Sequence, residues 1–445
     1  MFIKKTDEGL ERVIGVSGLS LTILNFTIGA GIFVLPAIVG MQLGTYGLFC
    51  YVFCAILLGC VMLCYAEIGS KVTSSGGTYA YVVSAFGEFP GFITSWLFLF
   101  AFGLASDAAV MNIIADSLAV IYPVFLSPWL RAFLFFILLA FMVLVNIRGT
   151  KQSIKFIKFV TVLKLLPLLA IIIFGFFHIK STNLHWGHLP TLNTFGSTAL
   201  VLFFAFLGFE KALTSSGEIR NSKRTIPRGI MLAGLLILVF YLLLQTVTQG
   251  VLSANMEAVK DAPLAAIAEK MVGPVGAIIL LLTAAFSCFT SLFGDVLASP
   301  RLLFAGANDG LFPKFLGKVH PKFATPHLAI IVWGLLIFIF SVSGGFKQMA
   351  ILASASILII YLAVILATIK MRTKKQEASD KTFKIPGGLT VPLIGIAAIS
   401  WMFTSLGKWE ILSVLIFIVV VCVIYVVMKK MKKEKITVVV EGKLL

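Results

Sequence analysis

The amino-acid sequence predicts an all-helical integral membrane protein that crosses the bilayer many times. Hydrophobic residues make up 59% of the 445-residue chain and charged residues only 12%, whereas a soluble protein carries about 25% charged residues. No Asp, Glu, Lys or Arg occurs from Val13 to Ala66. The apolar runs are long and continuous rather than alternating in segments of about ten residues, so the pattern indicates helices and not a membrane barrel.

The spacing of the apolar runs predicts twelve spanning helices, at about 20 residues for each crossing. They cover residues 14–40, 47–68, 92–120, 129–147, 157–178, 196–215, 229–252, 274–300, 327–343, 348–369, 390–406 and 410–428. No soluble module interrupts them. The chain is therefore predicted to form one membrane domain over residues 1–428, followed by a basic tail over residues 429–445.

Positive charge is distributed unevenly between the predicted loops. With the N-terminus inside, 28 of the 36 Lys and Arg residues fall in the tails and inner loops, and 6 fall in the outer loops. Cytoplasmic loops carry such an excess, so both termini are predicted to be cytoplasmic and the protein to lie in the cell membrane. The lysine-rich tail fits a membrane surface of anionic lipids, and the net charge of +17 therefore gives no reason to expect nucleic acid as a partner.

Two of the predicted spans contain residues that weaken a helix at its centre. The first reads IGAGIFVLP from Ile28 to Pro36, and the sixth reads FFAFLGFEKALTSSGE from Phe203 to Glu218. Gly disfavours a helix interior by about 1 kcal/mol relative to Ala, and Pro by about 3 kcal/mol. Five spans separate the two segments, which suits two inverted repeats of five helices, at about 13–178 and 196–369, with extra helices at about 390–428. Paired interruptions of this kind point to the central site of a transporter.

Five motifs occur in one order over nearly the whole chain. They are GAGIF (29–33), YAEIGSKVTSSGGTYAYV (65–82), GFEKALTSSGEIRNSKRTIPRGI (208–230), ANDGLFPKFLGKVHPKFATP (307–326) and FKIPGG (383–388). Together they resemble the amino acid permeases of the amino acid–polyamine–organocation (APC) superfamily. The resemblance implies a LeuT-like fold with discontinuous helices 1 and 6 and an amino acid as the small-molecule substrate.

Broken helices suit the binding of a zwitterion. Free N–H groups at the start of one half-helix favour a carboxylate, and free carbonyls at the end of another favour an ammonium group. The resemblance implies that N–H groups near Ala30 and Gly31 hold the carboxylate, and that carbonyls of Thr27, Phe204 and Leu207 hold the amine. A tight helix crossing at the glycines is the alternative. The predicted substrate-binding set is Thr27, Ile28, Gly29, Ala30, Gly31, Phe203, Phe204, Ala205, Leu207 and Gly208.

Two ionisable residues inside spans are candidates for gating or coupling. An intramembrane carboxylate such as Glu210 is a functional candidate by default, although it could instead pair with Lys211 near the inner interface. In some proton-coupled relatives, a lysine at the place of Lys164 fills the volume that sodium occupies in sodium-coupled ones. Burial disfavours the charged form of lysine, so Lys164 could serve as a titratable substitute for sodium, or it could snorkel to the headgroups.

Three further polar residues complete the predicted coupling and gating set. Ser291 in the eighth span is expected near Lys164, because the resemblance places sodium ligands in this region. Asp295 matches the position of a gating aromatic in the family, so it could select cationic substrates, or join a polar network with Arg301. Asp107 in the third span is an intramembrane acid without an assigned partner.

These features predict a secondary amino acid transporter that works by alternating access. Proton-coupled symport is the expected mode, with amino acid exchange or, less favoured, sodium coupling as alternatives. An intramembrane enzyme or a channel is disfavoured, because HExxH, GxSxG and GxxxxGK[ST] are all missing from the sequence and no filter-like repeat occurs. The six cysteines all fall within predicted spans, where we expect them to serve as small apolar packing residues. No metal or cofactor is expected.

Overall fold

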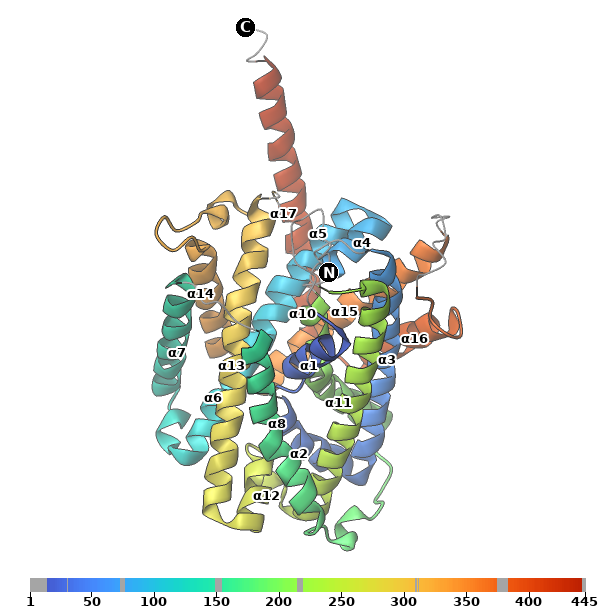
Figure 1. Cartoon of the computed structure of the whole chain (residues 1–445), viewed down its shortest axis with the longest axis vertical. Helices are drawn as coiled ribbons and strands as arrows, with labels where there is room; N and C mark the ends of the chain where they lie inside the picture. Colours follow the sequence, from blue (N-terminus) through green and yellow to red (C-terminus); the bar gives the residue numbers. More distant parts are fainter. Residues whose placement is uncertain are drawn as a thin grey trace, which may run out of the picture.

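A computed structural model describes residues 14–29, 31–72, 77–148, 154–213, 219–308, 310, 312–373 and 383–441. The described chain is almost entirely helical (Figure 1). Its only β-type pairing among these residues is an isolated bridge between Ile14 and Ile219, beside the start of the first helix.

The α-helices of the described residues follow one another along the chain. They are α1 (Val16–Thr27), α2 (Gly31–Leu43), α3 (Gly47–Lys71), α4 (Thr78–Phe86), α5 (Glu88–Trp96), α6 (Leu104–Ile121), α7 (Pro128–Arg148), α8 (Ile154–Phe176), α9 (Leu192–Phe203), α10 (Phe209–Leu213), α11 (Ser222–Leu252), α12 (Pro263–Val272), α13 (Pro274–Asn308), α14 (His327–Ser343), α15 (Phe346–Thr373), α16 (Thr390–Thr404) and α17 (Lys408–Glu441). A π-helical segment, η2 (Leu97–Gly103), joins α5 to α6 without a break in the helical run.

Within the described residues, eight helical stretches are long and apolar enough to cross a membrane. They are Gly31–Lys71, Glu88–Ile121, Pro128–Arg148, Leu192–Leu213, Arg224–Leu252, Pro274–Asn308, Phe346–Arg372 and Lys408–Lys429. Four shorter apolar helices accompany them, at Val16–Thr27, Val162–Phe176, His327–Ser343 and Thr390–Thr404. The predicted all-helical, multi-pass membrane protein is confirmed, and every predicted span overlaps one of these stretches. The count of twelve crossings stays a prediction.

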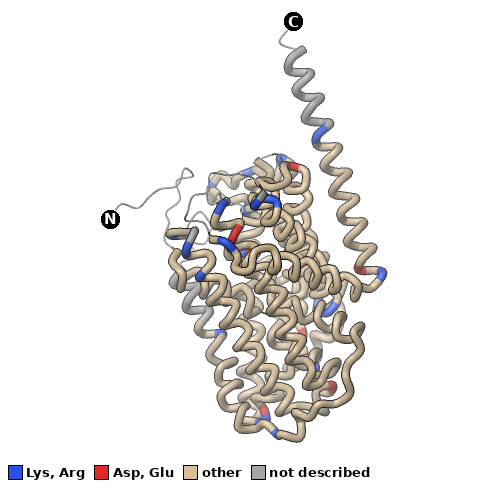
Figure 2. Tube along the Cα trace, turned by 90° about the vertical axis from the view of Figure 1, so that its right-hand side faces the viewer, with Lys and Arg blue, Asp and Glu red and all other residues tan. Residues whose placement is uncertain are grey.

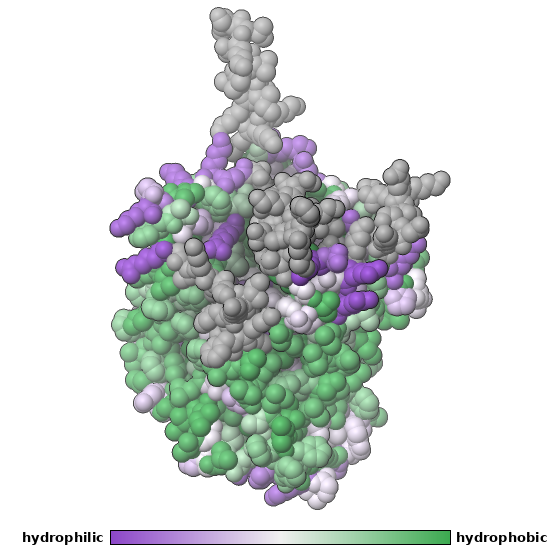
Figure 3. Space-filling view, viewed as in Figure 1, coloured by the Kyte–Doolittle hydropathy of each residue, from purple (hydrophilic) through white to green (hydrophobic). Residues whose placement is uncertain are grey.

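The outer surface has the character of a protein embedded in lipid. Large apolar side chains project outward around the body, including Trp129, Phe177 and Phe133, which are 86%, 82% and 59% exposed. Figure 3 shows this apolar surface as a broad green band with hydrophilic residues gathered at one end. Most Lys and Arg residues lie at that same end, from which α17 projects (Figure 2). Apolar exposure of this extent suits a hydrocarbon solvent.

Near that hydrophilic end, a buried carboxylate ties three segments together. Glu67 on α3 is 1% exposed and accepts hydrogen bonds from Arg372 Nε at 2.8 Å and from Lys71 Nζ at 3.0 Å. It also accepts the backbone N–H of Ile385 at 3.0 Å. The FKIPGG motif is therefore held against the ends of α3 and α15 by one acid.

The interrupted helices lie at the centre of the bundle. The α1–α2 segment packs against α8, α9, α10, α11 and α12, and α9 packs against α2, α3, α15 and α16. The longer helices α3, α6, α11, α13 and α15 surround them (Figure 1). A site formed at the interruptions is thus enclosed by protein on all sides rather than facing lipid.

Candidate functional site

The first helix ends where the glycines predicted an interruption. The last residue of α1 is Thr27, Ile28 follows with φ −78° and ψ 80°, and α2 begins at Gly31. Ala30, one of the predicted binding residues, lies outside the described residues. Pro36 is accommodated within α2, so the glycines and not the proline mark the break.

The second interruption lies between α9 and α10. The helix passes into a 3₁₀ turn over Phe204–Phe206, and Leu207 is extended with φ −80° and ψ 159°. Gly208 has φ +115°, a region that side-chain-bearing residues avoid. The predicted break in the sixth span is therefore confirmed, and Gly208 supplies the backbone conformation that it needs.

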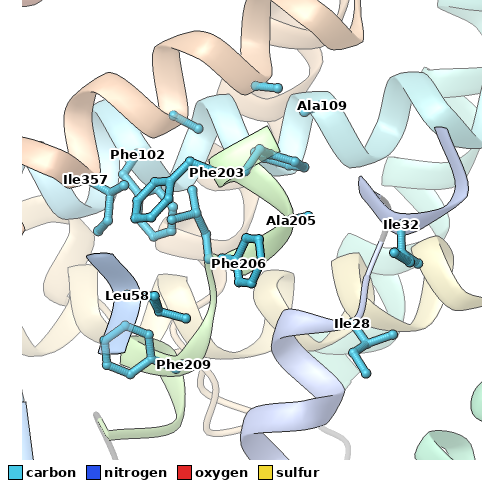
Figure 4. Close-up of a cluster of buried hydrophobic side chains, with 14 of the residues drawn as sticks. Ile28, Ile32, Leu58, Phe102, Ala109, Phe203, Ala205, Phe206, Phe209 and Ile357 are labelled. Atoms are coloured by element: carbon cyan, nitrogen blue, oxygen red, sulfur yellow. The ribbon is translucent and has the colours of Figure 1, made fainter. Parts of the chain in front are cut away.

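The two interruptions contact each other directly. A Cβ on Gly208 would lie 2.7 Å from the carbonyl oxygen of Phe26, and a Cβ on Gly31 would lie 3.2 Å from Cα of Ala205. The contact at Gly208 leaves no room for a Cβ, and the contact at Gly31 would be tighter than most Cβ contacts, so glycine allows the two backbones to come this close. Figure 4 shows the apolar side chains packed around this contact, with Ile28, Ile32, Phe203, Ala205, Phe206 and Phe209 labelled.

A tyrosine on a third helix joins the two interruptions. The hydroxyl of Tyr241 on α11 lies 3.1 Å from the Thr27 carbonyl oxygen and 2.6 Å from that of Ala205, so its single proton is shared between them. Tyr241 is fully buried. This contact could not be predicted from the sequence, since one tyrosine among nine in an apolar helix carries no distinguishing signal.

A small cavity lies between the interruptions, with a volume of about 40 Å³. Pockets that hold small molecules usually have about 300 Å³ or more, so the site is closed in this conformation. Six of the predicted binding residues border the cavity: Thr27, Gly29, Gly31, Phe204, Leu207 and Gly208. Three others, Ile28, Phe203 and Ala205, are buried in the packing beside it.

Two of the three carbonyls predicted to bind an amine already accept hydrogen bonds within the protein. The Thr27 oxygen accepts from Tyr241 and from the N–H of Gly29 at 2.9 Å. The Phe204 oxygen accepts from the N–H of Leu207 at 3.3 Å. A carbonyl has two lone pairs, so a ligand ammonium would have to displace a partner at Thr27.

Lys164 reaches the first interruption from α8. It is 1% exposed, and its Nζ donates to the carbonyl oxygen of Asn25 at 2.5 Å. The side chain is therefore directed into the protein and not toward the headgroups. Ser291 borders the cavity, but its hydroxyl makes no hydrogen bond to any described group, Lys164 included.

Glu210 fastens the second interruption to α15. One carboxylate oxygen accepts the N–H of Gly208 at 3.0 Å, and the other accepts the hydroxyl of Tyr361 at 2.9 Å. Glu210 is fully buried and does not border the cavity. The structure thus places it as a support of the break, a role that requires both of its oxygens.

Lys211 joins the two remaining acids. Its Nζ lies 2.6 Å from an oxygen of Asp295 on α13 and 3.9 Å from one of Asp107 on α6, and Trp333 Nε1 donates to the other oxygen of Asp107 at 3.2 Å. The ion-pair partner of Asp295 is therefore Lys211, and not Arg301 as one sequence interpretation had it. Lys211 was missed as a site residue, although three acids within apolar spans call for a buried cation.

The comparisons with known proteins agree with this architecture. The family model described as "Amino acid permease" matches residues 14–440. A branched-chain amino acid permease, BcaP, of Bacillus subtilis is 27% identical over 431 residues, which is 93% of this chain and 92% of the relative. The serine/threonine exchanger SteT of the same organism is 27% identical over 413 residues, 90% of this chain and 92% of the relative.

A third relative differs in the ligand that its name gives. The methylthioribose transporter of Bacillus subtilis is 27% identical over 435 residues, 93% of this chain and 92% of the relative. All three relatives are carriers of small molecules rather than enzymes, and the family model spans nearly the whole chain. The protein therefore belongs to the amino acid permease family of the APC superfamily, as its motifs predicted.

Proposed function

We propose that this protein is a secondary transporter that carries amino acids across the cell membrane by alternating access. The observation that carries the proposal is the cavity where the two interrupted helices meet. Six of the predicted binding residues border it. Relatives named as a branched-chain permease and a serine/threonine exchanger support amino acids as the substrate class. Since relatives of equal identity differ in their named substrates, the individual amino acid is left open.

The two interruptions provide the groups that an amino acid zwitterion needs. Moving a zwitterion into the membrane removes water from both charges, and fixed hydrogen bonds must replace it. The N–H groups of the first turn of α2, from Gly31 onward, have no partner within the helix and lie at its positive end. We assign the substrate carboxylate to them, and the ammonium group to the carbonyl of Leu207 and to that of Thr27 after it parts from Tyr241.

Alternating access follows from how the site is closed. The volume of about 40 Å³ has to expand for a substrate to enter, and the short helices α1 and α10 can move as units because each ends at an interruption. Twelve spans arranged as two inverted repeats, at about 13–178 and 196–369, would let each repeat open the site to one side. The excess of Lys and Arg at one end supports cytoplasmic termini.

Proton-coupled symport is the proposed mode. Lys164 donates to the carbonyl of Asn25 only two residues before the end of α1, so loss of its proton would remove the charge that strengthens this hydrogen bond and loosen the helix end that borders the site. Exchange of one amino acid for another is the second candidate, because one relative is named as an exchanger.

The test is transport by the purified full-length protein in liposomes. Labelled leucine, isoleucine, valine, serine and threonine are offered under separate proton, sodium and counter-substrate gradients. Uptake driven by a pH gradient without sodium is expected, whereas uptake that needs sodium and ignores pH would refute proton coupling. Failure of every amino acid to accumulate or exchange would refute the function itself.

A substitution at the interruption tests the placement of the site. In Gly31→Leu, a side chain would enter the space beside Ala205, which a Cβ already approaches to 3.3 Å. We expect loss of substrate binding. Gly59→Leu is the control, because a Cβ at Gly59 on α3 meets no atom within 4 Å, and its binding should stay at the level of the unmodified protein.

A further inference from the structure

Lys211 and three acids form an unbalanced charge cluster in the interior. Asp107, Glu210 and Asp295 surround the ammonium group, and all three acids are at most 8% exposed. Glu210 is held by Gly208 and Tyr361. The Lys211 ammonium lies 2.6 Å from Asp295 and 3.9 Å from Asp107. One ammonium cannot neutralise two carboxylates, and an uncompensated charge inside a membrane protein is strongly unfavourable.

Lys211 is the only described Lys or Arg within ion-pair distance of Asp107. From α14, Trp333 donates its indole N–H to one oxygen; from η2, the ring of Phe102 lies under the Lys211 ammonium at 5.5 Å. The α13 helix contributes Asp295, another acid. Among the described residues, the second oxygen of Asp107, Oδ1, has no hydrogen-bond partner.

Position separates the two acids of the cluster. Asp295, Lys211 and Ser291 border the central cavity, whereas Asp107 does not and is only 1% exposed. A substrate in the cavity can reach Asp295, but it cannot reach Asp107 behind the ammonium group. A proton can neutralise Asp107 in this position, because it needs no room beyond the O–H bond that it forms.

We propose that Asp107 binds and releases a proton during transport, and that Lys211 links this proton to the state of the cavity by moving between Asp295 and Asp107. The inference rests on the proposed transport function and adds a proton site to it, separate from Lys164. In the arrangement seen here, Lys211 pairs with Asp295, and a proton bonded to Oδ1 leaves Asp107 neutral.

The second arrangement follows from the distances. When the cavity opens, water or substrate hydrates Asp295, and Lys211 closes its 3.9 Å separation from Asp107. The ammonium then compensates the Asp107 carboxylate, the O–H bond breaks, and water in the open cavity takes up the proton. When Lys211 returns to Asp295, the Asp107 carboxylate takes up one proton from the water in the cavity. Each cycle therefore transfers one proton between Asp107 and water, and no other group.

The variant Asp107→Asn tests the proposal with little change in shape. The amide oxygen still accepts the Trp333 N–H, but the residue no longer titrates. Exchange of labelled for unlabelled substrate, chosen from the five amino acids above, should continue. For two protons per substrate, one at each site, a gradient of one pH unit supports at most about 100-fold accumulation, and in the variant, which keeps Lys164, we expect at most about tenfold.

Two control variants distinguish a loss of proton coupling from damage to the folded structure. Asp107→Glu keeps a carboxyl group and should retain pH-driven accumulation in part. Asp116 lies on the same helix but does not border the cavity. The control variant Asp116→Asn removes its 2.6 Å ion pair with Arg131, and accumulation should be unchanged. Undiminished accumulation by Asp107→Asn would overturn the proposal, as would loss of exchange together with accumulation.

The proton site at Asp107 can be tested independently of the proposed transport function. Difference infrared spectra of the purified protein, recorded across a pH titration, should show a protonated-carboxyl band that is missing in Asp107→Asn. A band that persists in the variant would refute the proton site, whatever is transported. If the band is lost but none of the amino acids moves, the proposed function fails and the proton site stands.

Discussion

The substitution Gly208→Ala should damage substrate binding far more than its single methyl group suggests. Gly208 has φ +115°, and holding a residue with a side chain in such a region costs about 1–3 kcal/mol. The added Cβ would also lie 2.7 Å from the Phe26 carbonyl oxygen, closer than real Cβ atoms come to other atoms. Because the obstacle is backbone, relief requires the two interruptions to separate.

The size of the effect follows from these two contacts. Both Gly208 and Phe26 border the cavity, so the strain falls on the residues that are proposed to hold the substrate. We expect the substrate-bound site to keep this close contact between the interruptions, so a cost of about 1–3 kcal/mol on the contact weakens affinity by roughly 5-fold to 150-fold. We expect a further loss of affinity, because separating the interruptions would displace the Gly208 N–H from Glu210, to which it donates.

Equilibrium binding of a labelled substrate to the purified protein measures this effect, with thermal unfolding recorded beside it. The matched control is Gly59→Ala in the middle of α3, where a Cβ meets no atom within 4 Å. That change should leave binding alone and raise stability by about 0.5–1 kcal/mol, since Gly disfavours helix interiors. Affinity of Gly208→Ala within twofold of the unmodified protein would refute the reasoning about the interruption.

Three other predictions concern side chains that hold the interior together. Lys164→Ala removes the bond to Asn25 and should reduce pH-driven accumulation more than substrate affinity; equal losses in both assays would contradict a coupling role. Glu67→Ala leaves Arg372 without its carboxylate, and at this partly exposed ion pair we expect a loss of about 2–3 kcal/mol in thermal unfolding. Tyr241→Phe removes the hydroxyl between the interruptions and should lower stability by about 0.5–1.5 kcal/mol; an unchanged melting temperature would count against the bridge.

The interruptions were predictable from sequence because their cause is local. Glycine spacing within an apolar run lowers helix stability at one place, whatever surrounds it, and both breaks occur where IGAGIF and FLGFE predicted them. The number of crossings is less accessible. Helical residues continue from α2 through a 3₁₀ turn into α3, with Gly44 at φ +55° providing the bend, so length alone does not divide the run into spans.

The partners of the buried charges could not be read from the chain. Lys211 meets Asp295 from 84 positions away, and whether these side chains face each other depends on the rotation of α10 and α13 about their axes. Sequence proximity instead suggested Glu210 as the partner of Lys211, and Arg301 as a partner of Asp295. Local patterns specify where helices end, whereas tertiary packing specifies which charges meet.

Backbone groups and side chains around the cavity are expected to contribute differently to substrate specificity. Backbone groups of the interruptions are suited to the carboxylate and ammonium that all amino acids share, so they cannot distinguish one substrate from another. The opposite wall of the cavity is made of side chains, namely Phe102, Ser106 and Val110 from η2 and α6 with Ser291 and Asp295 from α13. Because this wall carries two hydroxyl groups and the ion pair of Asp295, we expect it to favour a small or polar substrate side chain over a bulky apolar one. Within a family whose named substrates range from branched-chain amino acids to methylthioribose, we expect selectivity to follow this wall and not the glycines.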